Sequence, residues 1–181
     1  QKKFRIDDYE VFIPSDLPKE KPLPPSTIIH DNFDVGNHAD IDGQSSSDGL
    51  FTWHRFSSGA LTVIRTDTSA YADGQSINQR GHYRAELDLS TTDHYVQAQL
   101  RTEHDSFTPA LMARKDSTTT LTWYECQLGS GSDVLWLLKV VTGTPTVLTT
   151  NAMTINLATF YTIKFSVNGS TLRTFNSGTQ V

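Results

Sequence analysis

The chain has 181 residues, a formal net charge of -5 at pH 7 and a pI near 5.6. This length suits one well-buried domain with some residues left over. The acidic balance argues against broad binding to nucleic acid or to an anionic membrane, because both need a basic surface that displaces counterions. No apolar run approaches the roughly 20 residues of a membrane span, so membrane insertion is not expected.

The first segment, "FRIDDYEVFIP", alternates apolar and polar residues as a strand does. A stretch in which prolines alternate with charged residues follows it, between positions 14 and 25. Proline lacks the backbone N–H that a sheet interior needs, so this stretch is typical of an extended linker. We therefore expect a strand over residues 1–13, a Pro-rich linker over 14–27 and one domain over 28–181.

From position 31 onward, short β-like segments alternate with turn residues, at the spacing of an all-β antiparallel β-sandwich. Asn168-Gly169 is a strong signal for a two-residue hairpin turn. No segment has a helical period. The expected strands cover residues 61–66, 83–89, 95–102, 110–115, 121–128, 134–141, 146–150, 160–167 and 171–176.

Alternation assigns the two faces of these strands, because successive side chains of a strand point to opposite sides. In "LTWYECQL", Tyr124, Cys126 and Leu128 form the expected buried set, and Trp123 and its alternate neighbours lie outside. The segment over 134–141, "VLWLLKVV", is apolar on both faces, which indicates a central or covered strand. The remaining expected core residues are Tyr83, Ala85, Leu87, Leu89, Tyr161, Ile163, Phe165 and Val167.

The order of these segments resembles the concanavalin A-like lectin/glucanase superfamily in its laminin G-like form. The likeness rests on "DNFD" followed by "GLFTWHRFSSGALTVI", on "RAELDLSTTDHYVQAQL" as paired strands, on "ALMARKDSTTTLTWYECQL" and on "FYTIKFSVNGSTLRTFNSG". It implies a jelly roll of two antiparallel sheets, with sugar held on a concave face or at rim loops. A fold of this kind does not by itself imply an activity.

The resemblance also bears on the first strand. Family members usually end with a strand bearing an Ile-Asp-Asp-like motif, and the matching "RIDDYEVFI" stands here at the front. Either residues 1–13 end a preceding similar domain of an array, or the fold is completed out of the usual order. The proline-rich linker that follows favours the first alternative.

Glu86 and Asp88 share one face of a strand, as the paired carboxyl groups of a retaining glycosidase must. The laminarinase-like members of the superfamily carry a third acidic residue in this row, and Ser90 and Thr91 stand here at its place. That absence argues against glycan cleavage, so the chain is expected not to be an enzyme. A glycoside hydrolase or polysaccharide lyase stays the weakest alternative.

The same stripe of polar residues suits carbohydrate binding better, because aromatic rings stack on sugars while charged and amide side chains bond their hydroxyls. The alternative is an ordinary solvated sheet face with weak cross-strand ion pairs. The candidate ligand-binding residues, with Trp123 as the stacking platform, are Arg84, Glu86, Gln99, Arg101, Arg114, Trp123, Glu125 and Gln127.

No cofactor is expected apart from structural calcium, for which Asp31, Asp34, Asp40 and Asp42 could supply oxygens. Turn chemistry explains these four aspartates equally well. Trp53 could lie at a rim or anchor the core, and anchoring is the commoner role.

Three functions compete on this basis. The first is a non-catalytic carbohydrate-binding or adhesion module of a larger virion or extracellular protein. The second is a structural or decorating domain of a bacteriophage capsid or tail with no glycan ligand, and the third is a glycan-cleaving enzyme. The expected partners are glycans or other virion or surface chains, including further copies of this one, and the expected location is a virion or the cell surface.

Overall fold

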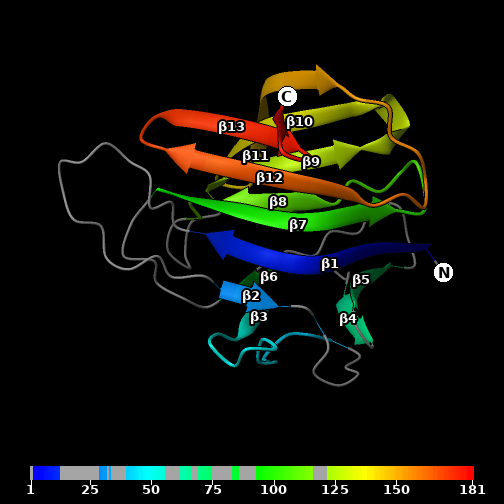
Figure 1. Cartoon of the computed structure of the whole chain (residues 1–181), viewed down its shortest axis with the longest axis vertical. Helices are drawn as coiled ribbons and strands as arrows, with labels where there is room; N and C mark the ends of the chain where they lie inside the picture. Colours follow the sequence, from blue (N-terminus) through cyan, green and yellow to red (C-terminus); the bar gives the residue numbers. More distant parts are fainter. Residues whose placement is uncertain are drawn as a thin grey trace.

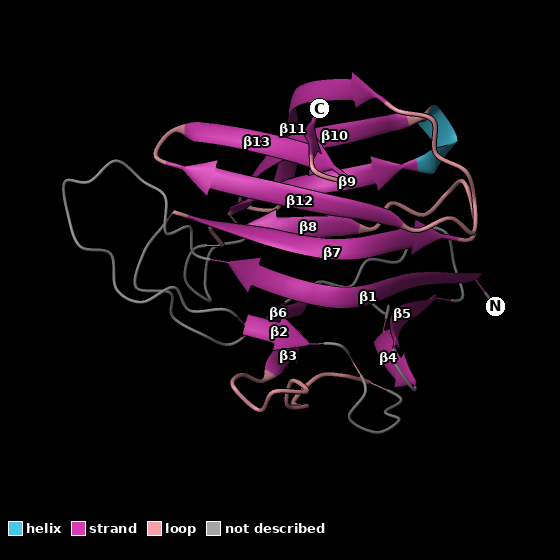
Figure 2. Ribbon diagram, viewed as in Figure 1, coloured by secondary structure: helices cyan, strands magenta, loops and turns pink. Residues whose placement is uncertain are grey.

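The structure is a computed structural model that describes residues 2–12, 29–31, 33, 40–55, 62–66, 69–74, 83–85, 93–115 and 122–181. Figure 2 shows that strands dominate it, with a small helical turn between β9 and β10. The strands are β1 (Lys2–Phe12), β2 (Ile29–Asp31), β3 (Trp53–Arg55), β4 (Thr62–Thr66), β5 (Ser69–Gly74), β6 (Tyr83–Ala85), β7 (His94–Thr102), β8 (Ala110–Ala113), β9 (Trp123–Gly129), β10 (Val134–Val141), β11 (Thr144–Ala152), β12 (Tyr161–Asn168), β13 (Thr171–Asn176) and β14 (Thr179–Gln180).

The strands form two main antiparallel sheets, packed as a sandwich. The large sheet has eight strands in the order β14-β13-β12-β7-β1-β5-β4, with β2 paired to β1, and the small sheet has the order β11-β10-β9-β8. In Figure 1, β13, β12, β7 and β1 run side by side across the nearer face, with β8 to β11 behind them. The expected all-β antiparallel sandwich is confirmed. No helix in the described ranges is long and apolar enough to span a membrane.

The core lies between the inner faces of the two sheets, as the alternation predicts. From the large sheet it takes alternate residues of β7 and β12, among them Leu100 and Phe165, which are fully buried. From the small sheet it takes Leu128 and Leu135, which face each other in the pairing of β9 with β10. Trp53 belongs to this core, so it anchors the fold and does not stand at a rim.

Short turns set the register of the later strands. Thr142 and Gly143 both have positive φ, at 47° and 80°, and connect Val141 to Thr144 of the paired strands β10 and β11. A two-residue loop with two positive φ values matches the right-handed twist of the flanking strands. A two-residue turn joins β12 to β13, as predicted, but its residues are Gly169 and Ser170, because Asn168 is the last residue of β12 and faces Thr171. Gly169 has a positive φ of 53°.

The first strand lies inside the large sheet. β1 pairs antiparallel with β7 on one side, where Phe4 faces Thr102, and with β5 on the other, where Phe4 faces Ala72. β1 fills the position between β7 and β5 and joins them into one sheet. The assignment of residues 1–13 to a preceding domain stays a prediction. The linker expected at 14–27 lies outside the described residues, and so does the domain boundary.

Candidate functional site

The outward side of the large sheet presents a continuous polar and aromatic surface, which we call the outer face. In β7 the residues from His94 to Thr102 alternate strictly between buried and partly exposed. The partly exposed set points away from the core because successive side chains of a strand alternate. This set consists of Tyr95, Gln97, Gln99 and Arg101.

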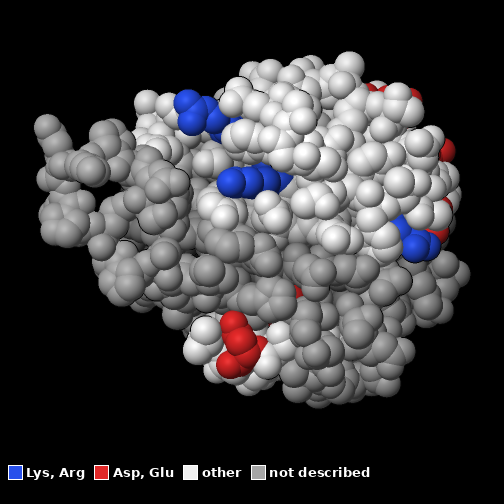
Figure 3. All heavy atoms as spheres, in the orientation of Figure 1, with Lys and Arg blue, Asp and Glu red and all other residues white. Residues whose placement is uncertain are grey.

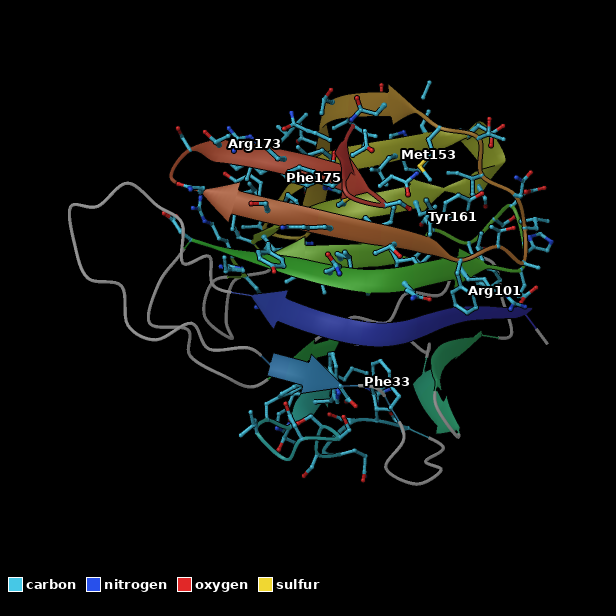
Figure 4. The ribbon with its side chains drawn as sticks, in the orientation of Figure 1. Phe33, Arg101, Met153, Tyr161, Arg173 and Phe175 are labelled. Atoms are coloured by element: carbon cyan, nitrogen blue, oxygen red, sulfur yellow. The ribbon has the colours of Figure 1, made fainter. Side chains whose placement is uncertain are left out.

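The neighbouring strands extend the outer face. β12 adds partly exposed Lys164, which faces Gln97 of β7 on one side and Phe175 of β13 on the other. β13 adds Arg173 one pleat away from Phe175. Figure 4 shows Arg173 and Phe175 along β13, with Arg101 at the far end of β7. Gln97, Lys164 and Phe175 therefore make one row across three hydrogen-bonded strands.

A cation–aromatic cluster lies at the centre of this face. The Lys164 ammonium stands 3.7 Å from the centroid of the Tyr95 ring and 5.5 Å from that of the Phe175 ring. Such contacts contribute about 0.5–2 kcal/mol, depending on how far the cation is desolvated. Burial lowers the pKa of Lys164 from its ordinary value. Both aromatic side chains are partly exposed, so the cluster borders solvent.

Arg101 occupies the other end of the outer face. Its guanidinium pairs with the Glu103 carboxylate and lies 5.3 Å from the centroid of the Phe160 ring. Gln99, two residues earlier on β7, faces Thr162 of β12. The structure therefore brings Gln99 and Arg101 together on one surface, as the alternation predicts.

The candidates of β9 lie on the opposite side of the sandwich. Trp123, Glu125 and Gln127 point away from the core, as predicted, but from the small sheet. Trp123 and Glu125 are only 4% and 5% exposed. The Trp123 indole donates to one Glu125 oxygen at 2.8 Å, and the Gln127 amide donates to the other at 2.8 Å. The predicted stacking platform is thus a buried ring, and the Glu125 carboxylate already accepts hydrogen bonds from two neighbours.

The single binding surface expected from the sequence is accordingly divided. Gln99 and Arg101 are on the outward side of one sheet, and Trp123, Glu125 and Gln127 are on the outward side of the other. Arg84 lies in β6, which pairs with β3 so that Arg84 faces His54, and not beside β7 as expected. Glu86 and Asp88 lie outside the described residues. No one ligand of ordinary size can touch both outward sides of a sandwich whose sheets pack about 10 Å apart.

Arg114 has a structural contact at one end of the sandwich. Its guanidinium donates to the Gly169 carbonyl oxygen at 2.5 Å and to Asp93 Oδ1 at 2.8 Å. The backbone N–H of Gly169 donates to the same Asp93 oxygen at 2.9 Å. These bonds join the end of β8 to the start of β7 and to the β12–β13 turn. The Arg114 donors therefore hold the two sheets together at this end.

The candidate calcium ligands use their oxygens in turns and in buried hydrogen bonds. Asp40 accepts from the Asp42 backbone N–H at 3.0 Å, and Asp42 accepts from the Arg55 N–H at 2.9 Å. Asp31 is fully buried and accepts three N–H bonds. Asp34 lies outside the described residues, so the calcium site stays a prediction. Within the part of the chain that the structure describes, no group of three acidic, His or Cys side chains is placed to hold a metal ion.

The Cys126 side chain points inward from β9 and is fully buried in the core. Burial, with a smaller contribution from the neighbouring Glu125 carboxylate, raises the pKa of its thiol to about 12. An unfolded cysteine has a pKa of about 8.5, so the folded state holds the proton more tightly than the unfolded state does. This difference contributes to the free energy of unfolding. The contribution is complete below about pH 8.5 and is lost as the pH rises toward 12.

We expect Cys126 to resist a disulfide reagent in the native protein at about pH 8 and to react once the chain unfolds, because only the exposed thiolate is nucleophilic. The labelling rate, measured by absorbance against denaturant concentration, should follow the unfolding curve. A Cys126→Ala variant should lose less stability than the parent between about pH 8.5 and pH 11. Native-state labelling as fast as that of the unfolded chain would contradict this assignment.

Five residues of the outer face were absent from the predicted site: Tyr95, Gln97, Lys164, Arg173 and Phe175. Alternation places Tyr95 and Lys164 on an exposed side, which is the signal that could have found them. Their proximity depends on the pairing of β7 with β12 and of β12 with β13. The local pattern of one strand carries no information on which other strand it pairs with.

Comparison with known proteins gives one structural likeness. No known protein family matches the sequence, and no curated protein matches it. A carbohydrate-binding module from Bacillus subtilis, CBM66, is similar in structure with a TM-score of 0.52 and 14% sequence identity. The likeness covers 71% of this chain and 76% of that module. At this level of identity, what the two chains share is the β-sandwich fold.

Proposed function

We propose that the chain is a non-catalytic carbohydrate-binding module of a larger protein, and that it binds glycan on the outer face of the large sheet. The observation that carries the proposal is the row of Gln97, Lys164 and Phe175 across three paired strands, with Tyr95 against Lys164. The likeness in fold to a bacterial carbohydrate-binding module supports it.

The chemistry of the row suits a sugar. A pyranose or furanose ring presents an apolar side to an aromatic ring and hydroxyls at its edge, which amides and cations can bond. Phe175 and Tyr95 are partly exposed and offer the rings, while Gln97 and Gln99 offer both donors and acceptors. Because these side chains stand on hydrogen-bonded strands and not on loops, little conformational entropy is lost when a ligand binds.

The direct test is a glycan array followed by calorimetry on the best ligand. Phe175→Ala should weaken binding about tenfold through the loss of ring contact, and Gln97→Ala should weaken it to a similar extent through lost hydrogen bonds. Thr146→Ala, an exposed change on β11 at the other sheet, is the matched control and should leave binding unchanged.

Thermal unfolding of each variant separates loss of binding from loss of fold. Gln97→Ala removes a partly exposed amide, so it tests the site even if Phe175→Ala proves unstable. Binding that survives both changes would place the ligand elsewhere. The absence of any ligand on a broad array would contradict the proposal itself.

One observation favours the alternative of a structural domain without glycan ligand. The edge strand β11 is exposed on both faces along nearly its whole length, with Val147 at 54% and Leu148 at 47% exposure. An uncharged exposed edge of this kind can pair with the same edge of a second copy of the chain. Negative glycan arrays together with concentration-dependent self-association in sedimentation would favour this role. The virion or cell-surface setting remains a proposal for either role.

The enzymatic alternative depends on Glu86 and Asp88, which lie outside the described residues. Within the described residues the outer face of β7 carries amides and Arg101 and no carboxylate pair. Release of reducing ends from a polysaccharide, lost in Glu86→Gln, would support cleavage in place of binding.

A further inference from the structure

The charge of the outer face deepens the proposed function, on which the following inference rests. Lys164 and Arg173 are both cationic and both project from the β12–β13 hairpin on its outward side. Lys164 faces Phe175, and Arg173 is two residues from Phe175, so the two cations are diagonal neighbours in the ladder. Diagonal neighbours of this kind lie about 7–8 Å apart at the backbone, within the joint reach of two long side chains.

Neither cation is neutralised within the described residues. Lys164 contacts the rings of Tyr95 and Phe175, and no carboxylate of the described chain pairs with it or with Arg173. Three other described surface cations, Arg55, Arg101 and Arg114, each pair with a carboxylate. Figure 3 shows Lys and Arg atoms over β12 and β13 next to uncharged described atoms, with acidic atoms near the lower loop and the right-hand edge.

The strand next to β12 in the sheet, β7, carries amides beside this cationic pair. Glu10 and Asp7 of β1 occupy the register positions opposite Gln97 and Gln99, one strand beyond β7. Along the described side chains, the row therefore passes from the cations Lys164 and Arg173 to the amides Gln97 and Gln99, so the positive charge is concentrated at the β12–β13 end.

We propose that the glycan bound by the outer face is anionic, with a uronate carboxylate or a sulfate ester held between Lys164 and Arg173 while the sugar ring contacts Phe175. Arg binds a carboxylate or sulfate through two parallel N–H donors, and Lys adds a point charge on the other side. The aromatic rings lower the local exposure to water and strengthen both interactions.

The test compares two polymers with the same backbone, polygalacturonate and its methyl ester, which lacks the charge. We expect the protein to bind polygalacturonate at least about tenfold more tightly than the ester, and to bind it more weakly as ionic strength rises. Lys164→Gln and Arg173→Gln should each remove most of this preference. Lys139→Gln, the same charge change at an exposed position of β10 on the other sheet, should leave it intact. Sulfated and unsulfated forms of one further polymer separate a sulfate ligand from a carboxylate.

The outcomes separate this inference from the proposed function. Equal binding of the charged and uncharged polymers, or tight binding of neutral glycans alone, would overturn the anionic ligand and leave glycan binding intact. A preference for anions that survives both Lys164→Gln and Arg173→Gln would also overturn it. Failure to bind any glycan would remove the proposed function as well. Arg173 is exposed, so its variant tests the inference even if Lys164→Gln alters the packing around Tyr95.

Discussion

Replacing Asp31 with Ala should destabilise the protein by about 3–6 kcal/mol. The Asp31 carboxylate is fully buried and accepts from the Trp53 indole at 2.6 Å, from the Phe33 N–H at 2.8 Å and from the Ser47 N–H at 3.2 Å. Removing the carboxylate takes this acceptor from three donors. Those of the buried Phe33 and Trp53 cost about 1–3 kcal/mol each, and the half-buried Ser47 N–H costs less. Phe33 also has a positive φ of 57°, a conformation that the Asp31 bond helps to hold.

Chemical denaturation monitored by Trp fluorescence measures this loss. Asp31→Asn should cost less than Asp31→Ala, because the amide keeps one acceptor oxygen but presents an N–H₂ group to a remaining donor. Asp40→Ala is the matched control: Asp40 also accepts a backbone N–H two residues later, but it is partly exposed, so its loss should cost about 1 kcal/mol or less. Similar losses for Asp31→Ala and Asp40→Ala would show that the buried network contributes little.

Phe165→Ala should cost about 3–5 kcal/mol, because it deletes a fully buried ring between the two sheets and leaves a cavity. Phe165 faces Val96 of β7 and Thr174 of β13 in the central part of the large sheet. The neighbouring change Ser166→Ala lies on the outer face of the same strand, and it should shift the free energy of unfolding by no more than about 0.5 kcal/mol.

This pair of variants tests the assignment of faces on which the proposed site depends. Both changes fall on β12, one residue apart, so differences in strand propensity are small beside the difference in burial. Urea titration gives the two free energies, and the slope shows whether unfolding stays two-state. A large loss in Ser166→Ala with a small loss in Phe165→Ala would reverse the faces, and the outer face would then be the core.

Much of the local structure follows from the sequence. The alternation in residues 94–102, 123–129 and 161–168 assigns each side chain to the correct side of its strand, because a period of two is fixed by strand geometry. Asn168-Gly169 marks its hairpin because glycine readily adopts the positive φ that the turn requires. The apolar pattern on both faces of "VLWLLKVV" correctly indicates β10, which lies between β9 and β11.

What the sequence does not contain is the pairing of distant strands. Gln99 and Trp123 each point outward from their own strand, but β7 and β9 belong to different sheets, so the two residues lie on opposite sides of the sandwich. Trp123 shows a second property that the sequence pattern does not predict, the covering of a sheet face. Alternation assigns a side chain to a face, and whether other parts of the chain cover that face is decided only by the tertiary structure. The outer-face cluster of Tyr95, Lys164 and Phe175 exists because three strands pair in one particular register.

The position of β1 has a consequence for how the protein is made. As the chain is synthesised, β1 leaves the ribosome long before β7, which is its partner through Phe4 and Thr102. It can pair earlier with β5, but the edge that will receive β7 then stays open until most of the chain has followed. Closing so long a loop costs entropy before any contact offsets it, so folding should be slow compared with a sandwich built from neighbouring hairpins. The open edge of β1 is the place where a nascent chain is most exposed to pairing with the wrong partner.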